Sequence, residues 1–223
     1  MIQKHPITNT FARRVGRGLR QAQKELLANY LPTVQVHATP DFFKQKIKAG
    51  NVCLEIGIGN GEYFINNAKT HPCNTYIACE PYLNGMASAL RQAKDSNLKN
   101  VRFFPDDVRI LLNNISANYF AEIHIICPDP WPKRRQHARR LITRDFIKLL
   151  STKLVASGKL IIATDHREYA EWILKSIIDS QSFALQSNDV NDYTKLPEGW
   201  LHTKYQRIGL SKNHRIYYFS LNL

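Results

Sequence analysis

The sequence has few cysteines, and none in the spacing of a metal or redox motif. Its four cysteines, Cys53, Cys73, Cys79 and Cys127, form no CxxC pair and have no histidine at metal-ligand spacing. Three of them lie inside apolar runs with the length of strands. We therefore expect small buried side chains in a reducing compartment, which favours a cytoplasmic protein without a metal site.

Long apolar segments are also lacking. No run approaches the roughly 18 apolar residues of a membrane helix, and the N-terminal stretch has no apolar core of a signal peptide. Hydrophobic residues make up 43% of the 223 residues and charged residues 22%, which excludes a disordered or collagen-like chain. The length predicts one core, and we assign residues 1–39 to a basic extension with a helix and 40–223 to a single domain.

Acidic residues are absent from three segments that are rich in basic ones. Residues 1–24, 133–144 and 199–223 hold 16 of the 31 Lys and Arg residues and none of the 18 Asp and Glu residues. The remainder of the chain is slightly acidic, so the whole net charge of +13 comes from these segments. Such clustering is typical of a protein that binds a polyanion, and residues 133–144 lack the apolar face of a membrane-binding helix.

Short apolar runs alternate with segments of helical spacing. The predicted strands are residues 51–56, 75–80, 101–104, 122–127 and 159–164. This alternation predicts a mainly parallel sheet that helices cover on both faces. After a helical segment at 170–178, residues 183–186 and 215–221 are predicted to be a closing antiparallel strand pair.

Helical segments are expected between the strands and before them. Leu83, Ala87 and Leu90 share one helix face, and Thr143 is a candidate N-cap for a helix that we expect Gly158 to end. Residues 13–30 are predicted to form one basic helix outside the core.

The first chemical signal is a glycine-rich loop after the first strand. Its sequence is Glu55-Ile-Gly57-Ile-Gly59-Asn-Gly61, and a helix over 62–69 follows. Glycines let the backbone approach a ligand, and the free N–H groups of the helix start face that ligand. Glu80 ends the next strand, where a carboxylate can accept hydrogen bonds from both ribose hydroxyls.

Two cofactors fit such a loop, a nicotinamide dinucleotide and S-adenosylmethionine. The spacing is G-x-G-x-G, and the pyrophosphate motif is G-x-G-x-x-G. The carboxylate of Glu55 would repel a pyrophosphate but suits a sulfonium and an amino group. The pair Asp106-Asp107, after the third strand, is placed to meet an adenine edge. Together these residues favour S-adenosylmethionine.

The second signal is the segment Cys127-Pro-Asp129-Pro-Trp131-Pro-Lys133-Arg-Arg135 after the fourth strand. Its three prolines have fixed φ and push the residues before them toward extended conformations, so we expect six nearly extended residues. Such a stiff rim would hold Asp129 and Trp131 in place before substrate arrives. Residues 134–140, RRQHARR, form a basic flap suited to phosphates, in which His137 is expected to contact phosphate or backbone.

The chain resembles the bacterial tRNA (guanine-N7-)-methyltransferases. The resemblance covers almost the whole chain, through RRVGR, LEIGIGNGEY, DPWPKRRQHARRL, ATDHREYAEW and TKYQRIG in that order, and the DPWPK segment is its most specific part. It implies a Rossmann-like class I methyltransferase fold, with a mostly parallel seven-stranded α/β sheet, helices on both faces and an antiparallel C-terminal strand. It also implies methyl transfer from S-adenosylmethionine to N7 of a variable-loop guanosine in tRNA, with S-adenosylhomocysteine as the other product. Nothing in the sequence indicates an obligate protein partner.

The resemblance also assigns roles to residues of this sequence. The cofactor would be bound by Glu55, Gly57, Glu80, Asp107 and Asp129, and Asp129 would also be the catalytic residue. The tRNA would be bound by Lys133, Arg135, His137, Arg139, Arg140, Asp165, Thr203, Lys204, Tyr205 and Gln206. Guanine N7 carries a lone pair and no proton, so we expect Asp129 to orient the base and to balance the developing positive charge without acting as a base. The nucleotide is expected to be drawn out of its tertiary pairing, with Trp131 or Tyr205 as a stacking surface.

This sequence departs from the family pattern at two positions. Gln206 stands where the family usually has glutamate, and Asn213 stands where it tends to have a glycine. Gln206 keeps the hydrogen-bonding capacity of the glutamate but drops its charge, and the sequence leaves open whether the role of that residue is preserved. Two other functions fit part of the pattern: a dehydrogenase that uses the same loop, and an RNA-binding protein that keeps the fold without activity.

Overall fold

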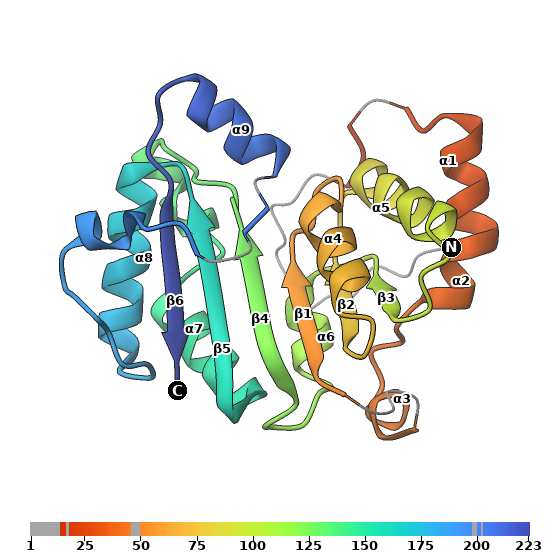
Figure 1. Ribbon diagram of the computed structural model, residues 1–223, viewed down its shortest axis with the longest axis horizontal. Coiled ribbons are helices and arrows are strands. Elements are labelled where there is room, and N and C mark those ends of the chain that lie inside the picture. Colours follow the sequence, from red (N-terminus) through yellow and green to blue (C-terminus); the bar gives the residue numbers. More distant parts are fainter. Residues whose placement is uncertain (1–13, 17, 46–49, 198–199, 202) are drawn as a thin grey trace.

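A computed structural model describes residues 14–16, 18–45, 50–197, 200–201 and 203–223. Within these residues the chain forms one sheet of six strands (Figure 1). In order across the sheet they are β3 (Val101–Phe104), β2 (Thr75–Cys79), β1 (Val52–Ile56), β4 (Phe120–Ile126), β5 (Leu154–Thr164) and β6 (Tyr217–Asn222). All neighbours are parallel except β5 and β6, which pair antiparallel, so the predicted α/β sheet is confirmed.

Helices cover both faces of this sheet. In chain order the helical segments of the described residues are α1 (Gln21–Glu25), η1 (Leu26–Tyr30), α2 (Leu31–Val34), α3 (Pro40–Gln45), α4 (Glu62–Thr70), α5 (Leu83–Asp95), α6 (Val108–Leu112), η2 (Arg134–Arg139), α7 (Arg144–Lys153), α8 (Arg167–Ser180), η3 (Val190–Thr194) and α9 (Lys204–Ser211). Figure 1 shows α4 and α5 on one face of β1 to β3, and α9 above the carboxyl ends of the parallel strands.

The hydrophobic core is divided by the sheet. The larger cluster packs α6, α7 and α8 against one face. The smaller one packs α4 and α5, with the side chains of Leu27, Leu31 and Val34, against β1 to β3. The core therefore fixes the strands, and the loops at their carboxyl ends are held on a rigid base.

The prediction of a seventh strand is wrong for the described residues. Residues 183–186, expected to pair with the C-terminal strand, form a loop, and β6 pairs with β5 alone. Phe183 and Leu185 pack on the larger core cluster from this loop, so their burial does not require a strand ladder. The Tyr193 hydroxyl donates to the Ser187 carbonyl at 2.7 Å and fixes the turn that follows.

Two helix predictions also need correction. The N-terminal helical stretch begins at Gln21, and residues 14–16 and 18–20 are not helical; Arg13 lies outside the described residues. The prediction that this stretch lies outside the core is also wrong. Its side chains Leu27, Leu31 and Val34 have helical spacing and pack on the smaller core cluster.

The helix α7 begins at the predicted cap, since the Thr143 side chain accepts a hydrogen bond from the Phe146 amide. It ends at Lys153 and not at Gly158, because Leu154 is already extended and starts β5. No helix of the described residues has the length and apolarity to cross a membrane.

Candidate active site

The glycine loop joins β1 to α4 in left-handed backbone conformations. Gly57 and Gly61 have φ of 76° and 84°. A Cβ on Gly61 would lie 2.6 Å from the Cβ of Ala89, so this glycine lets α4 pack against α5. A Cβ on Gly57 would meet nothing within 4 Å, and this residue is exposed. Gly57 therefore presents open backbone to a ligand, as its predicted role requires.

Two buried carboxyl groups lie beside this loop. Glu55 belongs to β1, and Glu80 follows β2. Burial, and then the charge of Glu80, raise the pKa of Glu55 well above its ordinary value. Burial raises the pKa of Glu80 to about 7, although the Tyr82 and Gly59 amides donate to it at 2.8 Å each and oppose the shift. A positively charged ligand would stabilise the ionised form of both groups.

Asp107 lies at the end of β3, as predicted, and its carboxylate is already bonded to Arg109. One oxygen accepts from the Arg109 amide at 2.8 Å and from Nε at 2.9 Å, and the other accepts from Nη2 at 2.7 Å. Asp107 also caps α6. Its orientation is therefore fixed, and any contact with an adenine must be shared with Arg109.

The described start of the chain crosses this side of the site. The Arg14 guanidinium donates to Asp106 Oδ1 at 3.0 Å, and the Leu83 amide donates to the Arg14 carbonyl at 2.8 Å. The Gly16 amide donates to Asn84 Oδ1 at 3.3 Å. The sequence marked Arg14 through the RRVGR motif and Asp106 through the Asp106-Asp107 pair, but it did not predict their contact, because the two residues are 92 positions apart.

The proline-rich rim after β4 turns more sharply than predicted. Cys127 and Trp131 have φ of 50° and 44°, so the expected run of six nearly extended residues is wrong. Each precedes a proline, and the preference of such positions for extended backbone is overridden twice. The Cys127 amide still donates to the Ala163 carbonyl at 2.8 Å, so the turn starts directly at the end of the β4 ladder.

Asp129 lies between these two turns. Its residue is exposed, and partial desolvation raises the pKa of its carboxyl above the ordinary value. Asp129 also contributes a negative charge that raises the pKa of Glu80. Three acidic side chains thus concentrate negative charge at the carboxyl edge of the sheet, namely Glu55, Glu80 and Asp129.

The basic flap forms the short helix η2, and it divides into exposed and buried members. Lys133, Arg134, Arg135 and Arg139 are exposed. The Arg139 guanidinium lies 5.1 Å from the centre of the Trp131 ring. His137 is half-buried, with Nε2 at 3.2 Å from Glu168 Oε1, and does not share the exposure of the arginines. Arg140 is buried.

Helix α9 stacks on the same edge of the sheet. Thr203 caps it and shares a capping box with Gln206, whose side chain is 0% exposed. Gln206 Oε1 accepts from the Thr203 amide at 3.0 Å and from Trp200 Nε1 at 3.1 Å. The side chains of Lys204 and Tyr205 lie outside the described part of the structure.

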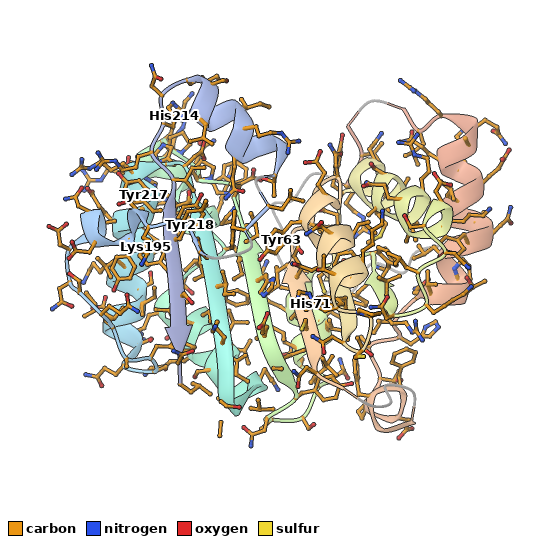
Figure 2. All side chains as sticks on the ribbon, viewed as in Figure 1. Tyr63, His71, Lys195, His214, Tyr217 and Tyr218 are labelled. Atoms are coloured by element: carbon orange, nitrogen blue, oxygen red, sulfur yellow. The ribbon has the colours of Figure 1, made fainter. Side chains whose placement is uncertain are left out.

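Trp200 is in turn held by aromatic neighbours from α4 and β6. Its ring centre lies 4.8 Å from that of Tyr63 in α4 and 5.1 Å from that of Tyr218 in β6. Figure 2 labels Tyr63 and Tyr218, which line a groove of about 790 Å³ together with His71 and Lys195. These contacts fix the segment before α9, a role that sequence reasoning did not give to Trp200.

Four further contacts join α9 and the residues that flank it to the site. Asp165, which follows β5, lies so close to Gly209 that a Cβ there would be 2.5 Å from Asp165 Oδ2, and His214 Nδ1 is 3.4 Å from the same oxygen. Arg207 pairs with Glu62 at the start of α4 at 2.8 Å. Thr203 hydrogen-bonds the Cys127 thiol, whose pKa burial raises to about 12.

These elements enclose a small cavity of about 50 Å³. It is lined by residues of the glycine loop and the ends of β1 and β4, namely Glu55, Gly57, Ile58, Gly59, Asn60, Glu62, Ile126 and Cys127, and by Thr203. Two of the predicted cofactor residues, Glu55 and Gly57, therefore meet the start of α9 at one place. Among the described residues no group of three or more His, Cys, Asp or Glu side chains is arranged to hold a metal ion.

Comparisons with known proteins agree with this geometry. The model of a family described as "Putative methyltransferase" matches residues 49–219. Among solved structures, the antibiotic-resistance methyltransferase Kmr has a TM-score of 0.57 at 15% identity, over 84% of this chain and 93% of that one. At this identity the likeness concerns the fold alone, and it confirms a Rossmann-like class I methyltransferase fold with six strands in the described residues.

Relatives with higher identity are more informative. A bifunctional methyltransferase of Rickettsia conorii is 36% identical over 209 residues, which are 93% of this chain. The chain spans only 38% of the length of that relative. A tRNA (guanine-N(7)-)-methyltransferase of Buchnera aphidicola is 35% identical over 224 residues, covering 96% of this chain and 92% of that protein. The chain therefore belongs to the tRNA (guanine-N(7)-)-methyltransferase family.

Proposed function

We propose that this protein transfers the methyl group of S-adenosylmethionine to N7 of a guanosine in the variable loop of tRNA. The products are 7-methylguanosine in tRNA and S-adenosylhomocysteine. One observation carries the proposal: two buried carboxyl groups, Glu55 and Glu80, meet the Asp129 rim and its exposed arginines at one edge of the sheet. Membership of the family supports the same reaction.

The described residues fit S-adenosylmethionine better than a dinucleotide. In their ionised forms Glu55 and Glu80 would repel a pyrophosphate, whereas a sulfonium and an amino group would stabilise those forms. Each Glu80 oxygen accepts one amide N–H and keeps a lone-pair direction for a ribose hydroxyl. Gly57 gives open backbone at the same place.

The chain's own residues then have to position the base and stabilise charge. The cofactor, when bound, supplies an electrophilic methyl group on a positively charged sulfur. Asp129 would orient the guanine edge and balance the positive charge that develops on the base, and its exposure leaves it accessible to a nucleotide. No general base is required, because N7 has no proton to lose.

The RNA side of the site would be formed by the flap and α9. Lys133, Arg135 and Arg139 are exposed and suited to phosphates. His137 would contact RNA at the inner side of the flap, and Asp165, Thr203, Lys204, Tyr205 and Gln206 would close the site around the substrate. Gln206 would act through its neighbours, since its side chain is fully buried.

The organisation of the chain follows from these roles. We propose that residues 40–223 form the catalytic domain and that the basic extension 1–39 adds tRNA contacts and brings Arg14 to the cofactor side. We further propose that the enzyme acts in the cytoplasm, without an obligate protein partner. The four cysteines are all unpaired, as that compartment requires.

Methyl transfer from labelled S-adenosylmethionine to bulk tRNA tests the function. The tRNA is digested to nucleosides, and we expect label in 7-methylguanosine, with a reaction without enzyme as the matched control. Label in another nucleoside would change the target, and no label would contradict the activity. Binding of a nicotinamide dinucleotide without S-adenosylmethionine would indicate the dehydrogenase. Binding of tRNA and cofactor without transfer would indicate an RNA-binding protein.

A further inference from the structure

One arginine of the basic flap differs from its neighbours. The side chain of Arg140 is 1% exposed, whereas Lys133, Arg134, Arg135 and Arg139 are exposed. A guanidinium at this depth cannot bond an RNA phosphate without leaving its present partners. The expectation that Arg140 binds tRNA therefore does not fit its placement.

Arg140 contacts two parts of the protein, the rim and helix α8. Its Nε donates to the Pro130 carbonyl at 2.9 Å, and its Nη2 donates to Glu168 Oε1 at 2.9 Å. Its guanidinium carbon lies 5.1 Å from the ring centre of Tyr169 and 4.9 Å from that of Trp172. Glu168, Tyr169 and Trp172 all belong to α8, which packs on the core. Arg140 thus links the rim to a rigid helix.

The point of attachment is next to the proposed catalytic residue. Pro130 directly follows Asp129, and the two lie between Cys127 and Trp131, both in left-handed backbone. Each such conformation in a residue other than glycine is unfavourable and persists only when surrounding contacts impose it. The Arg140 hydrogen bond acts in the middle of this strained turn.

We propose that Arg140 is a positioning residue, which holds the Pro130 carbonyl against α8 and so fixes the Asp129 carboxylate for methyl transfer. This rests on the proposed function. The planar guanidinium is suited to the task, because it bonds a carbonyl and a carboxylate at once while it lies over two aromatic rings. A lysine has the same charge but a single ammonium, so it cannot reproduce this arrangement.

Arg140→Lys separates this role from a phosphate contact. A phosphate contact would tolerate lysine, and tRNA affinity and rate would stay close to wild type. If Arg140 fixes the rim, the single-turnover rate at saturating tRNA and cofactor should fall by about 10- to 100-fold, the loss expected from a misplaced reacting group. The dissociation constant of tRNA and its salt dependence should change by less than about twofold.

Glu168→Ala tests the same linkage from the other side. Glu168 is 51% exposed, so its removal does not require refilling the core. We expect a smaller fall in the same rate, and the double variant should be no slower than Arg140→Lys alone, because both changes break one linkage. Arg135→Ala is the comparison variant for a phosphate contact: it should weaken tRNA binding and reduce its salt dependence, which Arg140→Lys should not do.

The wild-type protein tests the proposed function separately from the role of Arg140. A wild-type protein that methylates no tRNA would contradict the proposed methyl transfer itself. With an active wild type, an Arg140→Lys rate within about threefold would overturn the positioning role. A loss of tRNA affinity in Glu168→Ala or Arg140→Lys with an unchanged saturated rate would also overturn it.

Discussion

Cofactor affinity should increase with pH through the ionisation of Glu80. The pKa of this buried carboxyl is raised to about 7, so Glu80 is largely protonated at pH 6 and largely ionised at pH 8. The ionised form is the better acceptor for ribose hydroxyls. At low pH, cofactor binding must therefore displace the proton of Glu80. The affinity for the cofactor falls as the pH falls below about 7.

The expected size follows from the pKa. About one Glu80 in eleven is ionised at pH 6 and about ten in eleven at pH 8, so affinity should be about tenfold weaker at pH 6. Glu55 contributes in the same direction, because its pKa is raised as well. Near pH 6.5 the binding should release at least roughly three quarters of a proton.

Isothermal titration calorimetry measures both quantities. Titrations at pH 6 and 8 give the affinity ratio, and two buffers of different ionisation enthalpy at pH 6.5 give the proton count. Glu80→Gln is the matched variant: the ligand's own titration is unchanged, while the contribution of Glu80 is removed. A wild-type affinity independent of pH, or a pH dependence that Glu80→Gln retains in full, would refute the reasoning.

Three substitutions test other parts of the site. Asp129→Asn should lower the single-turnover rate by about 10²–10³ with little change in tRNA affinity, because one preorganised charge is lost; a rate within about threefold of wild type would reduce Asp129 to a part of the rim. Gln206→Glu should leave kcat/KM for tRNA within about threefold, because the N–H groups of Thr203 and Trp200 both donate to a single oxygen; a gain above about tenfold would show that the site lacks a carboxylate it needs. Gly61→Ala should destabilise the protein by at least about 1–3 kcal/mol in chemical denaturation, since φ is 84° and Ala89 is 2.6 Å from the added Cβ; an unchanged midpoint would show that the loop tolerates a side chain.

The positions of the strands were predictable because each is a short apolar run that ends in a polar or glycine-rich segment. Val101–Phe104 was predicted without error, and β1 and β2 differ from the prediction by one residue each. The carboxyl ends of parallel strands share an edge, so Glu55, Glu80 and Asp107 were expected together, and the structure places all three there. The edge of the sheet was less predictable, because Phe183 packs on the core from a loop as well as it would from a strand.

Contacts between distant segments could not be read from the sequence. Two such contacts are the pair Arg14 and Asp106, 92 residues apart, and the pair Arg207 and Glu62, 145 residues apart. No local sequence pattern predicts these pairs. The same holds for Arg140, which is one of six basic residues in a segment of uniform character. Composition predicted a surface for a polyanion, and only the placement of Tyr169 and Trp172 in α8 shows that one of these cations is buried.

The glutamine at position 206 shows how a departure from a family pattern becomes interpretable through geometry. From the sequence, the loss of a carboxylate there removes a charge from the site. In the structure Gln206 is a capping-box residue, and one amide oxygen receives both the Thr203 amide and the Trp200 indole N–H. Its Nε2 is buried without a hydrogen-bond partner among the described residues, so the nitrogen contributes nothing that an oxygen would not. Either side chain can hold α9 against Trp200, and the amide does so without burying a charge.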